Sequence, residues 1–192
     1  MCGRITLTID AGKYREFCFG IQGLPPETVD GFQRIVGRYN IVPSSAIGIV
    51  RSEDGILHHT VCTWWILPPF GTDRVLFRTR EDGSRTFSWK TSARLAHFNS
   101  RFDTITNTRN RYWHSLLKRK RCVIIADGFY EWPAKELTTG DHPNFPSYFR
   151  FKDRRVFCFA GLWECVSDDR NEDFYSTNII TVEPNALLRT LP

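Results

Sequence analysis

The chain of 192 residues carries 26 Lys or Arg and 21 Asp or Glu, which gives a formal net charge of +5. Hydrophobic residues make up 41% and charged residues 24%, so the composition excludes a disordered chain, and no apolar run approaches the ~20 residues of a membrane-spanning helix. The length fits one domain with a substantial core, or at most two small ones.

Hydrophobic periodicity and turn residues predict many strands and few helices. Ile5, Leu7 and Ile9 alternate with polar residues, which indicates a strand, and Asp10 is a typical N-cap for a following helix. In chain order, the predicted elements are a strand over 4–9, a helix over 11–19, strands over 46–50 and 56–65, a hairpin over 73–89 turning at Asp82-Gly83, helices over 92–98 and 107–120, a strand over 121–132, paired strands over 147–151 and 156–163, a strand over 174–182 and a helix from 184. This order predicts an α+β fold, a single domain in which a mainly antiparallel, curled or barrel-like sheet is flanked by a few helices.

Positive charge is concentrated in one part of the sequence. Residues 83–126 contain ten Lys or Arg and one acid, Asp103. Such a segment is either a solvated basic surface or a site for a polyanion such as nucleic acid, and charge alone does not decide between them.

The six cysteines show no zinc-site spacing, since no CxxC pair or His cluster is present, and we expect no metal or other cofactor. Cys62, Cys122 and Cys158 lie in apolar runs and are predicted to be buried thiols. The first ten residues lack the apolar segment of a signal peptide. We therefore expect a cytoplasmic protein in a reducing compartment, with free thiols.

Cys2 directly follows the initiator methionine. Removal of Met1 would leave an α-amine with a pKa of about 7.7–8.0 beside a thiol with a pKa of about 8.5, so both groups would be partly nucleophilic at neutral pH. The amine of such a 1,2-aminothiol attacks an aldehyde to give an imine, and the thiol then closes a five-membered thiazolidine ring. The alternative is an incidental residue at a frayed terminus, which the strand predicted nearby disfavours.

An acidic residue stands at the end of the apolar strand predicted over 121–132. Glu131 is flanked by Tyr130 and Trp132, and a carboxyl group between aromatic rings is desolvated, which would raise its pKa and suit general acid–base catalysis. The alternative is a surface glutamate just beyond a strand. Asp127-Gly128 is typical of a turn or backbone bend, so we expect it to be structural.

Other polar and aromatic residues have both a functional and a structural interpretation. Asn99 and Arg101 offer an amide and a planar guanidinium that could hold phosphate, but they are also ordinary loop residues. Trp64 and Trp65 precede a proline break and could pack in the core or form a stacking platform for bases. Asn40 and Pro43, in the segment YNIVPSS, are typical of a turn between strands.

Several segments, taken together and in order, resemble one known family. They are MCGR at 1–4, RYNIVPS at 38–44, WWILPPF at 64–70, FNSRFDT at 98–104, RCVIIADGFYEW at 121–132 and FAGLWE at 159–164. The chain is similar to the SRAP family (SOS response-associated peptidases, or abasic-site processing proteins) from residue 2 to about residue 185. The resemblance implies a DNA-damage-response protein that binds single-stranded DNA and captures abasic sites.

The resemblance also implies roles for individual residues. Cys2, freed of Met1 by autopeptidase activity, would form a thiazolidine crosslink with the ring-opened sugar aldehyde in a lyase-like reaction. Asn99 would place the sugar near Cys2, and Glu131 would move protons during imine formation and ring closure. The residues implied to contact DNA are Arg4, Pro43, Trp64, Trp65, Arg101 and Trp132. The partner would be single-stranded DNA with an abasic site, bound near the nucleoid by a monomer without membrane association.

The sequence departs from the family pattern at three places. Trp65 stands where the family usually has glycine, and Asp103 where it usually has glutamate. The family also carries a histidine followed by RMP downstream of the asparagine that Asn185 resembles, whereas this chain stops at Pro192. We expect that the single SRAP domain over residues 1–192 is truncated just before this histidine; the alternative is that the protein has lost it.

Two other functions stay open from the sequence. A cysteine hydrolase of amides or peptides could use Cys2 as nucleophile and Glu131 as acid–base, although no obvious Cys-His pair accompanies them. A passive single-stranded-DNA-binding module could carry Cys2 as a vestige.

Overall fold

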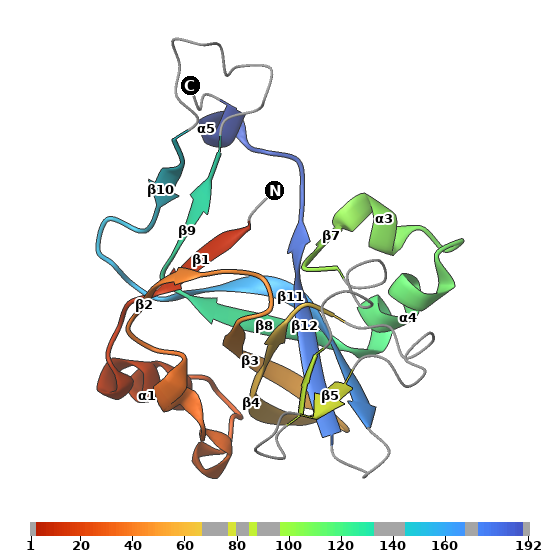
Figure 1. The fold of residues 1–192 in the computed structure, drawn as a ribbon, viewed down its shortest axis with the longest axis horizontal. Coiled ribbons are helices and arrows are strands. Elements are labelled where there is room, and N and C mark those ends of the chain that lie inside the picture. Colours follow the sequence, from red (N-terminus) through yellow and green to blue (C-terminus); the bar gives the residue numbers. More distant parts are fainter. Residues whose placement is uncertain are drawn as a thin grey trace.

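The structure is a computed structural model that describes residues 3–66, 77–79, 85–87, 97–132, 145–167 and 173–189 of the chain. It is an α+β fold in which a closed barrel of strands adjoins a second, smaller sheet (Figure 1), so the predicted fold class is confirmed. In the described part of the chain, no helix is both long and apolar enough to cross a membrane.

Five strands close the barrel. In pairing order they are β11 (Phe157–Ser167), β8 (Arg121–Ala126), β3 (Ala46–Glu53), β4 (Ile56–Trp64) and β12 (Asp173–Thr181), and β12 pairs with β11 to complete the ring. The β12–β4 pair is parallel and the others are antiparallel, so the barrel is mixed. β4 pairs with β12 as far as Thr177, and from Ile179 onward a short strand, β7 (Asn99–Arg101), pairs with β12 in parallel.

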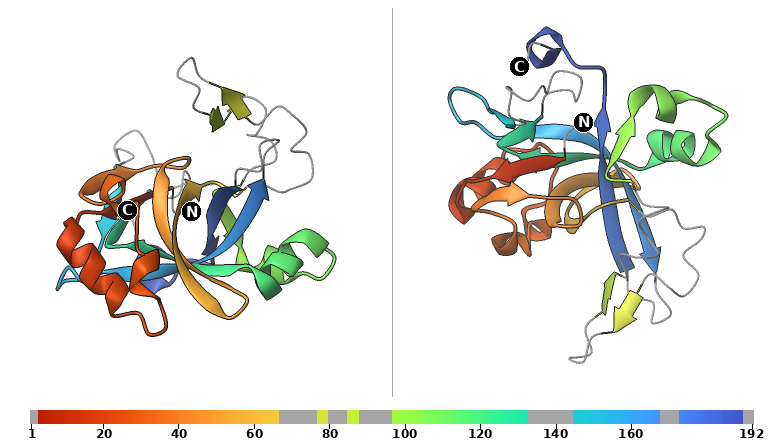
Figure 2. Two further views of the ribbon diagram at one scale, coloured as in Figure 1. Left: turned by 90° about the horizontal axis from the view of Figure 1, so that it is seen from below. Right: turned by 45° about the horizontal axis from the view of Figure 1, so that its top comes forward.

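The second sheet is antiparallel. Its strand order is β10 (Ser147–Phe149), β9 (Gly128–Glu131), β1 (Arg4–Leu7) and β2 (Arg38–Ile41). Figure 2 shows this sheet, with the red strand β1, against one side of the barrel. Since β8 and β9 are separated by Asp127 alone, one stretch of chain passes from the barrel directly into the second sheet.

A buried carboxylate fixes the bend between β8 and β9. Asp127 accepts hydrogen bonds from Thr6 Oγ1 at 2.6 Å, and from the backbone nitrogen and Oγ1 of Thr8 at 2.5 and 2.6 Å. Glycine follows because a Cβ on Gly128 would lie 2.4 Å from Tyr148 Oη and 2.7 Å from Thr6 Oγ1. The interpretation of Asp127-Gly128 as a structural bend agrees with this geometry.

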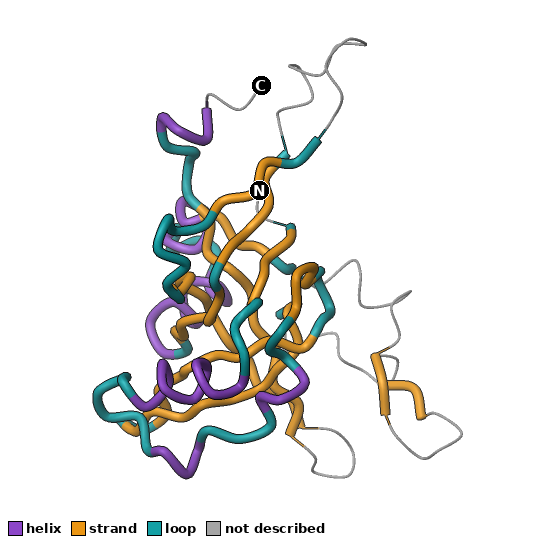
Figure 3. Tube along the Cα trace, turned by 90° about the vertical axis from the view of Figure 1, so that its left-hand side faces the viewer, coloured by secondary structure: helices purple, strands orange, loops and turns teal. Residues whose placement is uncertain are grey.

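The helices lie at the edges of the strand framework (Figure 3). They are α1 (Ala11–Phe19), α3 (Phe102–Thr106), α4 (Arg111–Arg119) and α5 (Ala186–Arg189), with 3-10 turns at Pro26–Thr28 and Phe32–Arg34. α1 begins where predicted, because Asp10 accepts a hydrogen bond from the backbone nitrogen of Lys13 at 2.9 Å. Its buried residues Tyr14 and Cys18 pack into the main core.

Two hydrophobic clusters hold these elements together. The larger joins the barrel, the second sheet and α1, and the smaller packs α3 and α4 against the barrel through Ile66, Ile105, Leu116 and Leu162. Cys62 and Cys122 are buried as predicted. Cys158 is exposed, so that prediction was wrong: exposed and half-buried residues alternate at the start of β11, and Cys158 falls on the outward face.

Several local predictions differ from the structure because long-range pairing decides them. The strands predicted over 147–151 and 156–163 do not pair with each other, since β10 joins β9 while β8 and β12 occupy both edges of β11. Residues 38–41 form β2 rather than a turn, and 99–101 form β7 rather than a loop. The helix predicted over 107–120 begins only at Arg111. β5 (Phe77–Thr79) and β6 (Arg85–Phe87) pair as the predicted hairpin, whose turn lies outside the described residues, as does most of 92–98.

Candidate functional site

Three strands that carry predicted site residues lie on the side of the barrel where the described chain begins. β1 starts at Arg4, β9 ends at Glu131, and β7 runs from Asn99 to Arg101. In Figure 1 the beginning of β1 lies between β9 on one side and the ends of β7 and β12 on the other. The structure therefore gathers the segments that carry the predicted site residues. Cys2, the predicted nucleophile, lies outside the described residues, immediately before Gly3 in the sequence.

Arg4 is held at this end of the second sheet from two directions. Its Nη1 donates a hydrogen bond to Asn40 Oδ1 at 2.8 Å, and its guanidinium carbon lies 5.7 Å from the centroid of the Trp132 ring. In the register of β1 and β9, Arg4 is opposite Tyr130. Continuing that register by one residue puts Gly3 opposite Glu131, so the start of the described chain faces the predicted acid–base residue.

The strand that carries Asn99 is fixed from both sides. The carbonyl oxygen of Phe98 accepts hydrogen bonds from Trp64 Nε1 at 2.9 Å and from the backbone nitrogen of Ile179 at 3.0 Å. One residue after Asn99, the hydroxyl of Ser100 accepts a 2.5 Å hydrogen bond from Asn178 Nδ2 inside the core. Asn99 itself is half-buried, so its position is set by buried neighbours while part of it stays accessible.

Trp64 does not fit its predicted role in contacting DNA. Its side chain is 0% exposed, its ring packs edge-on against Phe98 with centroids 6.3 Å apart, and its nitrogen is bound to the Phe98 carbonyl. The ring has no free face on which a base could stack. Trp64 therefore does not contact DNA as predicted, and its bond to Phe98 positions β7 instead. Trp65 is half-buried and also packs edge-on against Phe98, at 5.9 Å.

Pro43 is half-buried in the turn that connects β2 to β3. Ser44, the next residue, adopts a left-handed conformation with φ 76°, and its N–H donates to the carbonyl of Trp64 at 2.8 Å. The backbone nitrogen of Trp64 in turn donates to the carbonyl of Ser45 at 2.9 Å. These bonds tie the Pro43 turn to the end of β4, close to the strand that carries Asn99.

Arg101 points at two carboxylates. Its Nη2 lies 2.8 Å from Asp103 Oδ2 and 2.5 Å from Glu183 Oε1, and its Nε also donates to Asp103. The hydrogen bonds that Arg101 donates to Asp103 and then to Glu183 raise the pKa of Arg101, and the same bond from Arg101 lowers the pKa of Asp103. About half of the Arg101 side chain (51%) is exposed, so a phosphate can reach it only in competition with these two groups.

Glu131 is the last residue of β9, opposite Ser147 of β10, and is half-buried. Tyr130 and Trp132 beside it are half-buried as well, so the two rings do not enclose the carboxyl group completely. The Tyr130 ring packs at a tilt against the Tyr148 ring, with centroids 4.8 Å apart. This contact packs the end of β9 against β10.

Three residues around the site were missed by sequence reasoning. Asn40, which binds Arg4, was assigned to an ordinary turn, and Glu183 and Asn178 were not singled out. No local signal marks Glu183, which lies 82 positions from Arg101. The described residues contain no group of three or more His, Cys, Asp or Glu that could hold a metal ion.

Comparison with known proteins identifies the family. The profile described as SOS response associated peptidase (SRAP) matches residues 1–191. The chain belongs to the SRAP family. Among SRAP relatives, the abasic site processing protein YoqW of Bacillus subtilis is 27% identical over 192 residues, which cover 100% of this chain and 72% of YoqW. The abasic site processing protein HMCES of Gallus gallus is 28% identical over 205 residues, covering 95% of this chain and 57% of HMCES.

Solved structures show the same SRAP-like fold. A protein from Bacteroides thetaiotaomicron superposes with a TM-score of 0.71 at 22% identity, covering 99% of this chain and 72% of that one. A phage-related protein from Bordetella bronchiseptica gives a TM-score of 0.60 at 21% identity, covering 94% of this chain and 69% of its own. At these identities the likeness concerns the fold.

Proposed function

We propose that this SRAP protein captures abasic sites in single-stranded DNA through a covalent crosslink to Cys2. One observation carries the proposal: the family's motif strands converge around the beginning of β1, directly after the cysteine (Figure 1). The relatives named abasic site processing proteins support the choice of lesion.

The chemistry requires a terminal cysteine. After Met1 is hydrolysed away, the α-amine of Cys2 attacks the aldehyde carbon of the ring-opened sugar, and loss of one water gives an imine. The thiol sulfur then bonds to the same carbon while its proton passes to the nitrogen, which closes the thiazolidine. Amine and thiol sit on one skeleton, so the second step is intramolecular and favoured.

Asn99 and Glu131 act on either side of the beginning of β1. We assign Asn99 to holding the sugar, because its strand is locked by the Phe98 and Ser100 hydrogen bonds and cannot drift. We assign Glu131 to proton transfer, because a carboxyl at the partly exposed end of β9 can both accept a proton from the attacking amine and return one to the departing water.

DNA is held without reading a base. Arg4, anchored by Asn40 and Trp132, and Arg101 are the proposed phosphate contacts. Pro43, Trp65 and Trp132 are half-buried and offer apolar surface to neighbouring nucleotides. The protein acts as a monomer in the cytoplasm, where the thiol of Cys2 stays reduced.

A denaturing gel tests the proposal. The protein is mixed with a single-stranded oligonucleotide that carries one abasic site, and a slower protein–DNA band that survives denaturation is expected. Cys2→Ala should abolish the band, because both the thiol and ring closure are lost. Cys158→Ala is the matched control, since it removes an exposed cysteine that is not at the N-terminus and should leave the band intact.

Other outcomes would identify a different function. Salt-sensitive DNA binding with no stable band in the wild-type protein would indicate a passive binding module. Hydrolysis of an amide substrate without DNA would indicate a cysteine hydrolase. A band of equal intensity in Cys2→Ala would place the crosslink on another residue and contradict the proposal.

A further inference from the structure

We propose that the exposed face of α4, with the residues at its two ends, is a second DNA-contacting surface that binds the phosphate backbone of a single strand extending from the lesion. This inference rests on the proposed function for the identity of the DNA. The surface, called the α4 basic face below, consists of Arg109, Arg111, Lys118, Arg119 and Arg121, all of them exposed.

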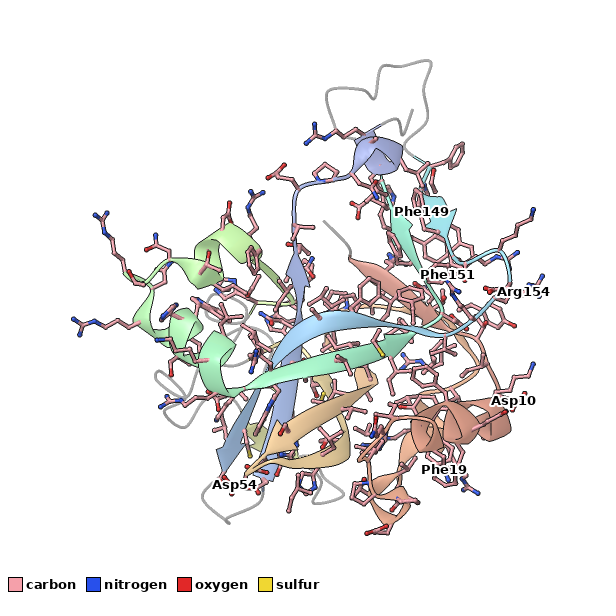
Figure 4. All side chains as sticks on the ribbon, turned by 180° about the vertical axis from the view of Figure 1, so that it is seen from behind. Asp10, Phe19, Asp54, Phe149, Phe151 and Arg154 are labelled. Atoms are coloured by element: carbon pink, nitrogen blue, oxygen red, sulfur yellow. The ribbon has the colours of Figure 1, made fainter. Side chains whose placement is uncertain are left out.

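The amphipathic pattern of α4 separates this face from the core. Leu116 is buried, and Tyr112, Trp113 and Leu117 pack with it against the barrel in the smaller hydrophobic cluster. Arg111, Lys118 and Arg119 are spaced by seven and eight residues along the helix, which brings them to one side of it, away from the cluster. Figure 4 shows nitrogen-tipped side chains that extend from the α3–α4 region into solvent.

No carboxylate in the same stretch of sequence balances this charge; Glu53 and Asp54, from the turn between β3 and β4, line a cavity beside Arg119 and Arg121 only, and Glu53 is paired with Arg51. Residues 104–126 contain no Asp or Glu. Within the described part of the chain, Arg109, Arg111, Lys118 and Arg121 form no ion pair, and Arg119 donates to the hydroxyl of Ser115. The positive side chains on this face repel one another, and an anion that spans several of them reduces this repulsion.

The neighbouring Lys120 shows what a paired cation looks like in this segment. It contacts the carboxylate of Glu164 and lies 5.1 Å from the centroid of the Trp163 ring, and it is only partly exposed. The charge of Lys120 is therefore neutralised within the protein, whereas the exposed cations of the α4 basic face can bind a partner.

The path of the chain puts the α4 basic face beside the capture site. β7, which carries Asn99 and Arg101, runs directly into α3, and α4 follows after a short turn. Figure 1 shows both helices on the β7 side of the barrel. A strand held at Arg101 can therefore continue over α4. Because the partners are phosphates, this surface should add affinity without sequence preference.

The test compares the wild-type protein with the double variant Arg111→Gln/Lys118→Gln. Binding is measured by fluorescence anisotropy over a range of salt concentrations. The probes are single-stranded oligonucleotides without an abasic site, of about five and about twenty nucleotides. At about 3.4 Å per nucleotide, only the longer probe reaches well beyond the capture site. For the longer oligonucleotide, we expect the variant to bind about threefold to tenfold more weakly and its salt slope to fall by about 1.4, or 0.7 per lost contact. Binding of the short oligonucleotide should not change.

The matched control is Lys13→Gln/Arg15→Gln on α1, which removes the same charge from exposed helix positions on the other side of the molecule (Figure 1). If the control loses as much affinity and slope as the α4 variant, or if neither loses any, the α4 basic face is not a DNA site. Crosslinking to a short abasic oligonucleotide is run in parallel. Its absence from the wild-type protein would overturn the proposed function, while the anisotropy result would still decide the role of α4.

Discussion

At the scale of single residues, Arg101 shows how the site balances its own charges against those of DNA. Its guanidinium is occupied by Asp103 and Glu183, which present oxygen atoms much as a phosphate would. Both carboxylates are largely exposed, at 63% of their side chains, so water and salt screen their attraction to Arg101. A phosphate can therefore displace them at modest cost.

The substitution Glu183→Gln should strengthen DNA binding. Removing the carboxylate frees one edge of Arg101 and also removes a negative charge that repels phosphate, so we expect an increase in affinity of up to about fivefold. Glu16→Gln, on the exposed surface of α1, changes the net charge equally and serves as control. Equal affinities for the two variants would show that Glu183 does not compete for Arg101.

At the scale of elements, the junction between β8 and β9 couples the barrel to the capture site. Asp127 is only 4% exposed and binds Thr6 near the end of β1 and Thr8 just beyond it, so the position of β1 depends on a carboxylate at the junction of β8 and β9. Thr6 also shares a hydrogen bond of 3.0 Å with Tyr148 Oη, which extends the same network to β10.

Replacing Asp127 by asparagine should destabilise the fold. The amide cannot accept at both positions used by the carboxylate, and hydrogen bonds to charged groups contribute about 1.5–3 kcal/mol, so we expect the free energy of unfolding in urea to fall by about 2 kcal/mol. Asp153→Asn is the control, because Asp153 is exposed with its nearest cation, on Arg155, at 3.8 Å. A change in Asp127→Asn no larger than in this control would mean that the junction is not held by the carboxylate.

The element scale also shows what could be predicted from sequence. Alternating residues over 4–7 and the Asp10 cap identified β1 and α1, and the motif segments pointed to Asn99, Arg101 and Glu131. Local patterns could not show that Trp64 is buried or that 38–41 and 99–101 are strands, because those outcomes depend on partners more than 30 residues away in the sequence. For the same reason, Glu183 could not be linked to Arg101.

At the scale of the whole molecule, a buried histidine links stability to pH. His59 is 7% exposed, and its Nε2 is 2.8 Å from Tyr14 Oη in a hydrogen bond between the barrel and α1. Burial lowers the pKa of His59 to about 4. In the unfolded chain the pKa is about 6.5, so the unfolded state binds the extra proton between these values.

The free energy of unfolding should therefore fall as the pH decreases. The contribution of His59 is complete above pH ~6.5 and is lost as the pH falls toward ~4, a change of about 3 kcal/mol. Urea unfolding between these pH values should show a shallower decline in His59→Gln than in the wild-type protein. His58→Gln, which changes the adjacent half-buried histidine, is the control. An unchanged decline in His59→Gln would exclude His59 as its source.

The central claim concerns one covalent bond, and tandem mass spectrometry of the protein–DNA conjugate tests it most directly. The account predicts that the conjugate has the mass of the protein without Met1 plus the abasic oligonucleotide minus one water. It also predicts that peptide fragmentation places the adduct on Cys2, with both its nitrogen and its sulfur bound. A conjugate that retains Met1, or an adduct located on a lysine, would contradict the account.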